Sequence, residues 1–220
     1  MIGGLLRFAA LVEQLAEAHM AVGRSGYSSR RWARADRRWT RYSVSGTLAA
    51  MPNGRRDAIE VSRGNGVRLR RAELEEYEQV APPWYQDPEV LQLSEGGEPP
   101  YDRARIRRMF EVLSGEGELY LIEVQEAAGW RAVGDAALLP DAMPIVIGRP
   151  EDRSRGIGTE VLQLLLLRAR ALGWTEVRVK GIDPANGRSR RLFERAGFVA
   201  VPTAPGASGA PIAMTRRLEL

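Results

Sequence analysis

The pattern of apolar and polar positions divides the chain from about residue 65 onward into short strands and helices. Positions 67 to 70 alternate between apolar and basic residues, which predicts a first strand. Stretches with helical spacing follow this strand, and prolines at 82 and 83 end the first of them. The predicted helical stretches are 72–80, 84–90 and 101–113.

The second half of the pattern begins with strands and ends with strands. Alternating residues predict antiparallel strands at 118–124 and 130–139, and the unbroken apolar run 143–148 predicts a buried strand. A loop with two glycines then opens an apolar helix that reaches Leu172. The remaining predicted elements are a strand at 176–182, a helix at 186–196, and strands at 198–201 and 212–218.

Residues 1 to 64 lack this succession of strands and helices. Apolar residues at helical spacing between 5 and 22, interspersed with charges, predict an amphipathic helix that is too short and too charged to span a bilayer. The stretch 23–65 mixes arginines with tryptophans and tyrosines, a composition found in flexible leaders and also in proteins that grip single-stranded nucleic acid. We expect a leader at 1–64 and a folded domain at 65–220. A working protein that begins at Met51 is a further hypothesis.

Composition and charge narrow the chemistry. The chain has no cysteine and a single histidine, so disulfides, thiolate nucleophiles, zinc sites and Ser-His-Asp catalysis are not expected, and neither is any other metal centre. Residues 1–64 hold 11 arginines and 5 acids, net +6, whereas residues 65–220 hold 21 basic and 23 acidic residues, net −2. The domain is therefore mildly acidic, which argues against a nucleic-acid-binding core and suits a cationic substrate. A cytoplasmic location fits this composition, and a homodimer is left open.

The glycine loop, Arg153-Ser154-Arg155-Gly156-Ile157-Gly158-Thr159, is the best candidate for a binding site. Where a glycine-rich loop becomes a helix, unpaired backbone N–H groups and the positive end of the helix dipole attract an anion, most naturally a phosphate. A dinucleotide-binding loop would need a third glycine at Val161, and a Walker loop would need Lys-Ser or Lys-Thr after Gly158. Neither motif is met.

The motif that does fit is Gln/Arg-x-x-Gly-x-Gly/Ala, met by Arg153, Gly156 and Gly158. A second signature follows on the next helix, Asn-x-x-Ala/Ser-x-x-Leu-Tyr/Phe-Glu-Lys/Arg-x-Gly-Phe. Its matching residues are Asn186, Ser189, Leu192, Phe193, Glu194, Arg195, Gly197 and Phe198. With both motifs at this spacing, the chain resembles the GCN5-related N-acetyltransferase (GNAT) superfamily over about residues 66 to 220.

The resemblance implies a fold, an activity and a cosubstrate. The fold is α/β with a mixed sheet, in the order β-α-α-β-β-β-α-β-α-β-β. The activity is that of an acyltransferase that moves an acetyl group from acetyl-CoA to a primary amine of a small molecule or peptide by direct attack. The residues that would bind the cosubstrate are Val146, Ile147, Gly148, Arg153, Ser154, Arg155, Gly156, Ile157, Gly158, Thr159, Asn186, Ser189 and Phe193. Asn186 would alternatively serve as the N-cap of the last helix.

Two departures from the family pattern affect the chemistry. Many members place a tyrosine at position 193 to protonate the leaving thiolate, and Phe193 cannot do this. The strand 143–148 carries no carboxylate to act as a general base. Asp135 and Asp141 are the remaining candidates, working through water, and for each the alternative is an ordinary surface or turn carboxylate. No catalytic residue is assigned.

The helical stretches between residues 72 and 113 are expected to build the acceptor side. There, Trp84 and Asp87 are candidates for binding a cationic amine, although tryptophans also commonly pack in cores. The main alternative to an enzyme is a non-catalytic acyl-CoA-binding regulatory module, which the missing tyrosine and base would favour. Binding of nucleic acid through the leader is a third reading.

Overall fold

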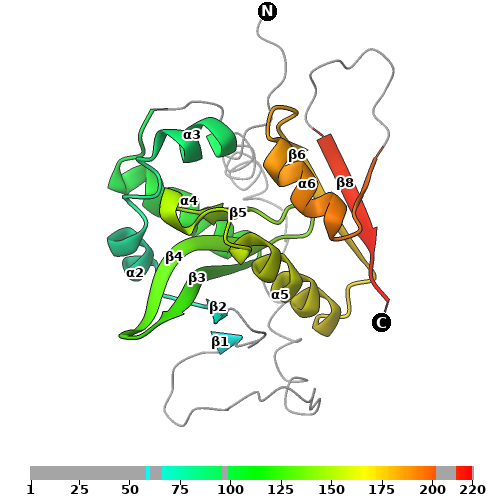
Figure 1. Ribbon diagram of the computed structural model, residues 1–220, viewed down its shortest axis with the longest axis horizontal. Helices are drawn as coiled ribbons and strands as arrows, with labels where there is room; N and C mark the ends of the chain where they lie inside the picture. Colours follow the sequence, from blue (N-terminus) through cyan, green and yellow to red (C-terminus); the bar gives the residue numbers. More distant parts are fainter. Residues whose placement is uncertain (1–57, 60–65, 96–98, 202–211, 220) are drawn as a thin grey trace, which may run out of the picture.

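The computed structural model describes residues 58–59, 66–95, 99–201 and 212–219 (Figure 1). The expected helix at 5–22 and nearly all of the arginine-rich stretch at 23–65 lie outside the described residues, so those predictions stay predictions. The elements before the glycine loop are β1 (Ala58–Ile59), β2 (Val67–Arg70), α2 (Leu74–Val80), α3 (Pro88–Glu95), α4 (Arg103–Glu116), β3 (Glu118–Glu126), β4 (Gly129–Leu138), β5 (Ile145–Ile147) and the 3₁₀ turn η3 (Pro150–Asp152). After it come α5 (Ile157–Ala171), β6 (Glu176–Ile182), α6 (Gly187–Arg195), β7 (Val199–Ala200) and β8 (Ile212–Arg217).

The α/β architecture is confirmed, with two refinements. Three helices, rather than the two in the predicted order, separate β2 from β3. The additional helix, α3, begins at Pro88 after Asp87, whose side chain accepts hydrogen bonds from the amides of Glu89 and Val90 and so caps the helix start. In addition, the short strand β1, which lies in the predicted leader, pairs with β2.

The strands form two sheets rather than one continuous sheet. One has the order β1-β2-β3-β4-β5 and the other the order β6-β8-β7, and all pairs are antiparallel. Within the described chain, β5 and β6 share no strand pairing, so the two sheets part between them. Gly134 allows β5 to pair closely with β4, because a Cβ at this position would lie 1.9 Å from the carbonyl oxygen of Val146.

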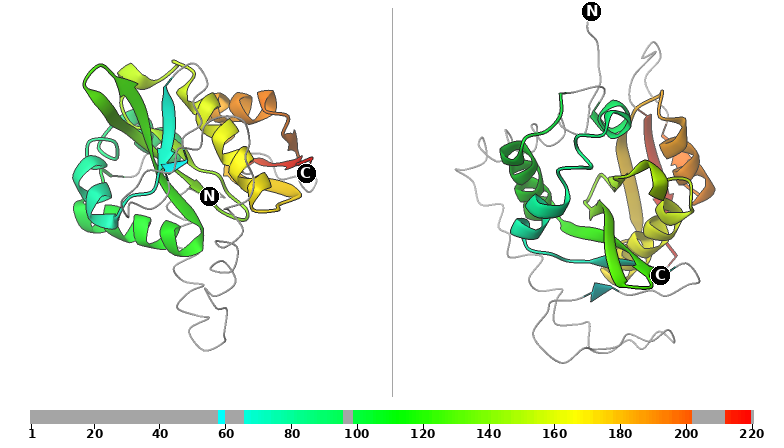
Figure 2. Two further views of the ribbon diagram at one scale, coloured as in Figure 1. Left: turned by 90° about the horizontal axis from the view of Figure 1, so that it is seen from below. Right: turned by 60° about the vertical axis from the view of Figure 1, so that its left-hand side comes forward.

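Helices cover both faces of the larger sheet (Figure 2). Side chains alternate along β4, so Ala136 and Leu138 join the core under α5, whereas Ala137 joins the core under α2, α3 and α4. We call these three helices, with the turns between them, the helical arm. Because α5 and the arm pack on opposite faces, the end of β5 and the start of α5 lie at the edge where the sheets part.

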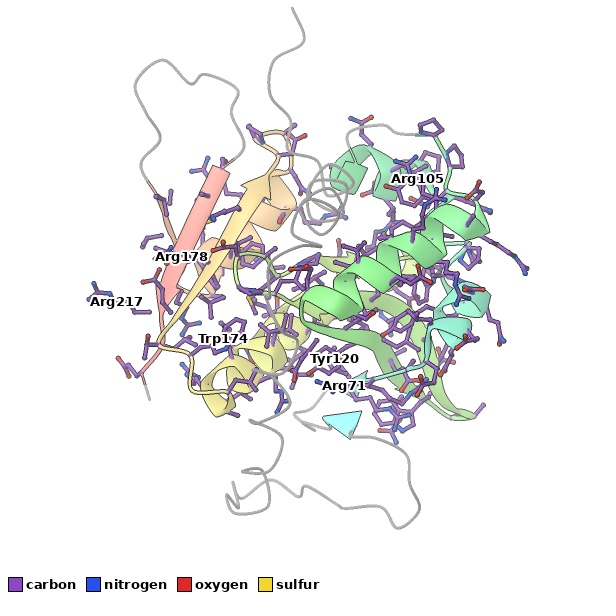
Figure 3. All side chains as sticks on the ribbon, turned by 180° about the vertical axis from the view of Figure 1, so that it is seen from behind. Arg71, Arg105, Tyr120, Trp174, Arg178 and Arg217 are labelled. Atoms are coloured by element: carbon purple, nitrogen blue, oxygen red, sulfur yellow. The ribbon has the colours of Figure 1, made fainter. Side chains whose placement is uncertain are left out.

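A partly buried ion cluster fixes α5 to the sheet. Glu118 of β3 accepts hydrogen bonds from Arg168 of α5, from Tyr120 and from Arg71. Figure 3 labels Arg71 and Tyr120 next to each other, and the guanidinium carbon of Arg71 lies 5.9 Å from the centre of the Tyr120 ring. Burial alone would raise the pKa of Glu118, but the donors from Arg168 and Tyr120 outweigh it and hold the pKa below its usual value. This cluster therefore fixes the position of α5, which follows the glycine loop, relative to β3.

The described boundaries agree closely with the hydrophobic pattern. The strands at 67–70 and 176–182 begin and end where the alternation does, and α6 differs by one residue at each end from the predicted 186–196. The predicted strand 143–148 is shorter, because Pro144 lies just before β5 and Gly148 follows it. None of the described helices has the length and apolar content needed to cross a membrane.

Candidate functional site

A cleft of about 1100 Å³ lies where the two sheets part. Its walls come from β5, the loop 152–156, the start of α5, the end of β6, the first turns of α6 and one face of α3. The walls are joined where the amide of Lys180 donates to the carbonyl oxygen of Asp141 at 3.0 Å and the two side chains form an ion pair at 2.7 Å. We call this joined part the narrow end of the cleft.

The glycine loop presents backbone donors to this cleft. Ser154 and Gly156 both have positive φ, 59° and 84°, and Gly156 occupies the N-cap position of α5 without a side chain to satisfy the first amides. The amides of residues 155 to 158 donate to no other residue in the described part of the chain, and the first paired amide is that of Thr159. Four donors at the positive end of a 15-residue helix form an anion site.

Gly158 leaves room that the protein itself does not fill. A Cβ at this position would meet only Leu192, at 3.8 Å, which is an ordinary contact. The absence of a side chain is therefore not demanded by packing, and Gly158 lines the cleft. The loop therefore has room beside its amides for a bulky anion, and the motif's assignment to a diphosphate stays a prediction.

Asp152 joins the glycine loop to β4. Its side chain is fully buried and accepts two hydrogen bonds of 2.9 Å from the guanidinium of Arg131 on β4, and Arg155 lies 3.4 Å away. The hydrogen bonds from Arg131 hold the pKa of Asp152 below its usual value. Sequence reasoning missed this residue, because the partners are 21 positions apart and no motif joins them.

Arg153, predicted to add charge at the phosphate, is held by protein groups instead. Its side chain is only 8% exposed and donates to the carbonyl oxygens of Ile147 and Gly148. It also forms ion pairs with Asp87, at 2.9 Å, and with Glu89, at 2.6 Å. Two carboxylates already offset its charge, so its visible role is to join the glycine loop to β5 and α3.

The two predicted acceptor-binding residues have structural roles in the helical arm. Trp84 is 2% exposed, and its indole lies so close to Gly148 that a Cβ there would be 2.0 Å from the ring. Asp87 caps α3 and pairs with Arg153, and these bonds outweigh its partial desolvation and lower its pKa. Neither residue is among those that line the cleft in the described chain.

Most of the predicted cofactor residues do come together. Val146, Ile147, Arg153, Ser154, Gly156, Ile157, Gly158, Thr159, Asn186, Ser189 and Phe193 all line the cleft. Gly148 and the side chain of Arg155 are placed elsewhere: the backbone of Gly148 packs against Trp84, and the guanidinium of Arg155 points to Asp152 and solvent. The amide of Arg155 is nevertheless one of the four free donors.

Asn186 and Phe193 are positioned by α6. The side-chain oxygen of Asn186 accepts from the amide of Ser189, so it caps the helix, and its nitrogen donates to the carbonyl oxygen of Leu93 in α3 at 3.2 Å. The ring of Phe193 is 3% exposed and packs edge-on against Phe198. The motif therefore contributes a cap and a wall to the cleft.

The two candidate bases lie in different environments. Asp135 on β4 is 1% exposed, accepts a hydrogen bond from the hydroxyl of Tyr85 and faces the helical arm. It is not among the described residues that line the cleft. Asp141 does line it, at the narrow end, and its half-exposed carboxylate pairs with Lys180. Geometry therefore favours Asp141 of the two.

The fold has counterparts in known proteins. Three similar crystal structures each give a TM-score of 0.55 or 0.56. The aminoglycoside acetyltransferase AAC(6')-Ib in complex with coenzyme A is 16% identical, over 69% of this chain and 94% of that one, with a TM-score of 0.55. A GCN5-related N-acetyltransferase from Brucella melitensis is 20% identical, over 76% and 80%, with a TM-score of 0.56. A putative ribosomal-protein-serine acetyltransferase from Vibrio cholerae is 18% identical, over 74% and 99%, with a TM-score of 0.55.

Sequence comparison is more specific than these distant structural likenesses. No curated protein sequence matches the chain. The family model described as an acetyltransferase (GNAT) domain, however, matches residues 67–199, which is more than half of the chain and includes both motifs. The chain therefore belongs to the GNAT acetyltransferase family.

Proposed function

We propose that this protein transfers an acetyl group from acetyl-CoA to a primary amine of a small molecule or peptide. The observation that carries the proposal is the set of free amides at residues 155 to 158, at the start of α5 in the wall of a cleft between two sheets. These amides would hold the diphosphate of the cosubstrate. AAC(6')-Ib, a structural relative, has been crystallised with coenzyme A and with acetyl-CoA, which supports the choice of ligand.

The strand β5 supplies the second part of the proposed binding site. Within the described chain it pairs only with β4, so the backbone groups on its other edge face the cleft. Pro144 and Gly148 bond to β4 through their backbones, so the alternation along the strand points the backbone groups of Ile145 and Ile147 toward the open edge. The carbonyl oxygen of Ile147 already accepts from Arg153, so the amide of Ile147 and the backbone groups of Ile145 would be offered to the amide-containing arm of the cosubstrate. Phe193, Leu192 and Ile145 add apolar surface. Such a site would direct the thioester toward the narrow end of the cleft.

The reaction would be direct attack of the amine nitrogen on the acetyl carbonyl carbon. A C–N bond forms, the C–S bond breaks, the sulfur leaves as the thiolate of CoA, and the nitrogen loses a proton. The fold would contribute mainly by holding both reactants at short range, an effect that reaches about 7–11 kcal/mol in well-oriented reactions. Because Phe193 has no proton to donate, the thiolate would leave unassisted or take its proton from water.

Asp141 is the proposed proton acceptor, through a water molecule. It lies at the narrow end of the cleft, is half exposed and can exchange protons with solvent. The alternative is that Asp141 only forms the ion pair with Lys180 that closes this end of the cleft. Asp141→Asn and Lys180→Met distinguish the two roles, since only the first substitution lowers turnover if Asp141 accepts the proton.

The acceptor is proposed to be cationic. The support is the net charge of the domain, which is mildly acidic as a whole. The cleft itself is lined by carboxylates, such as those of Glu116 and Asp183, and by cationic side chains in equal number. Trp84 and Asp87 do not support this part of the proposal, because packing and ion pairing occupy them. Among the structural relatives, AAC(6')-Ib, an aminoglycoside acetyltransferase, has a solved structure in complex with ribostamycin and coenzyme A.

A test of the function is the release of CoA thiol from acetyl-CoA in the presence of a panel of amines, with mass spectrometry of the acetylated product. Amine-dependent release with stoichiometric acetylation supports the transferase. Tight binding of CoA without turnover on any amine would instead support an acyl-CoA-binding regulatory module, which Phe193 and the lack of a carboxylate on β5 favour. Failure to bind CoA at all would contradict both.

A further inference from the structure

Helix α3 is joined to both walls of the cleft through one carboxylate. Glu89, in the first turn of α3, contacts Arg153 of the glycine loop at 2.6 Å with one oxygen and Arg188 of α6 at 3.0 Å with the other. The loop follows β5 in the larger sheet, whereas α6 follows β6 in the smaller one. Glu89 therefore spans the gap between the two sheets, and it also lines the cleft.

The two ends of this bridge differ in strength. At the loop end, the arginine is 8% exposed and is also bound by Asp87 and two backbone carbonyl groups, so this contact is fixed. At the α6 end, Arg188 and Glu89 are 56% and 45% exposed and share a single contact. Exposed ion pairs of this kind stabilise a fold only weakly and are screened by salt. The Glu89–Arg188 contact is thus the weaker of the two contacts that Glu89 makes.

An anion bound at the glycine loop would repel Glu89 and attract Arg188. Glu89 and Arg188 line the same cleft as Ser154, Gly156 and Gly158, so a diphosphate there meets a carboxylate that repels it and a guanidinium that attracts it. Arg188 is exposed and otherwise unconstrained by ion pairs within the described residues, so it can exchange one anionic partner for the other.

We propose that the Glu89–Arg188 pair is an electrostatic latch across the cleft, which the diphosphate of the cosubstrate opens by taking Arg188 from Glu89. The proposal rests on the proposed binding of acetyl-CoA. Glu89 acts as a positioning residue that holds α3 against α6 before the cosubstrate arrives. After the exchange, Arg153 and the bond from Asn186 to Leu93 still hold α3, but the ion pair no longer ties Glu89 to α6.

The two partners of the latch should affect CoA binding in opposite directions. In Glu89→Gln the competing carboxylate is gone, and we expect the dissociation constant of CoA to fall by about 3- to 10-fold. In Arg188→Gln the attracting group is gone, and we expect it to rise by a similar factor. Loss of a merely structural ion pair would move both variants in the same direction. Isothermal titration calorimetry with CoA at low and high NaCl measures these values, and the difference between the variants should shrink as salt increases.

The matched control is the Arg190–Glu194 pair on the same helix. Its side chains are 55% and 42% exposed, nearly the same as in the latch, but neither residue lines the cleft. Arg190→Gln and Glu194→Gln make the same changes in net charge and should leave CoA affinity within about twofold of the wild type. Shifts of equal size in these variants would assign the effect to overall charge and overturn the latch.

The outcomes separate the latch from the proposed function. If the wild type binds CoA and Glu89→Gln binds it equally or more weakly, the latch is wrong and the function stands. If the wild type does not bind CoA, the proposed function fails, and hydrogen exchange in the free protein still tests the bridge. Faster exchange of the α3 amides in Glu89→Gln, with no change in Glu194→Gln, is expected there, and equal exchange in all proteins would contradict the bridge.

Discussion

The two sides of the cleft differ in the kind of group that they present. The glycine loop offers backbone amides whose direction is set by positive φ at Ser154 and Gly156. The helical arm offers side chains, and those that looked suited to a substrate, Trp84 and Asp87, are occupied by packing, capping and ion pairing. A site built from the backbone leaves a local glycine pattern in the sequence, whereas a site built from side chains of separate helices leaves no such pattern.

Arg153 lies between these two sides of the cleft. It belongs to the loop motif, yet its guanidinium is bound by two acids of the arm and by carbonyl groups of β5. The arm thus positions the loop rather than the substrate in this part of the molecule.

The largest expected effect is on stability, from Trp84→Ala in the arm. Removing a fully buried indole that fills the space beside Gly148 should lower the free energy of unfolding by about 3–5 kcal/mol. Trp130→Ala is the control, since that ring is partly exposed and stacks with Arg68, a contact of about 0.5–1 kcal/mol. Denaturant unfolding measures both. If the Trp84→Ala protein is as stable as the wild type and has a raised KM for the amine, Trp84 binds the acceptor and its packing role is wrong.

Asp152→Asn should be next in size. It breaks an ion pair between the buried carboxylate of Asp152 and the one-third exposed guanidinium of Arg131, which should cost up to about 3 kcal/mol of stability, whereas the exposed neighbour Glu151→Gln should change it by less than about 0.5 kcal/mol. Because the folded-state pKa of Asp152 is depressed, its contribution is present above its unfolded pKa of about 3.9 and is lost as pH falls through the lower folded value.

Unfolding curves between pH 3 and pH 7 check this second prediction. The wild type should lose more stability than Asp152→Asn as the pH falls below about 4. Parallel losses in the two proteins would mean that the pair with Arg131 does not stabilise the folded state.

Gly158→Trp should abolish most CoA binding with little loss of stability. An indole at this position would fill the space over the free amides, and we expect the dissociation constant to rise by about a hundredfold or more, equivalent to about 2.7 kcal/mol. Leu167→Trp places the same side chain on the exposed face of the same helix and should leave binding unchanged. Equal CoA affinity in both variants would contradict the assignment of the diphosphate to the loop.

The smallest effect is expected for Phe193→Tyr. The added hydroxyl should leave turnover unchanged or raise it by up to about tenfold if it can protonate the leaving thiolate. Phe198→Tyr adds the same hydroxyl to the other ring of the pair, outside the cleft, and should not change turnover. Steady-state rates with acetyl-CoA and an accepted amine decide the matter. A large loss in Phe193→Tyr would show that the packing of its ring matters more than the missing proton donor.

Much of the fold and half of the site could be predicted from local patterns. The alternation at 67–70 and 176–182 gave those strands, and the two spaced motifs gave the loop and the cap at Asn186, because each depends on neighbouring residues. The alternation of apolar and polar residues does not show the division into two sheets, since each strand looks the same whether or not its neighbour is paired; only the family resemblance implies that the strand before the glycine loop splays from the one after it. The role of Asp152 depends on Arg131, and that of Glu89 on Arg153 and Arg188, partners that lie far apart in the sequence.

The most direct test of the account is an amide ¹H–¹⁵N spectrum of the full chain titrated with CoA. The account predicts that the amides of residues 155 to 158 show the largest shifts, moving downfield as they begin to donate to the diphosphate, while those of the arm at 84 and 85 change little. Saturation with CoA that leaves the four loop amides unchanged, or the absence of any CoA-dependent change, would contradict it.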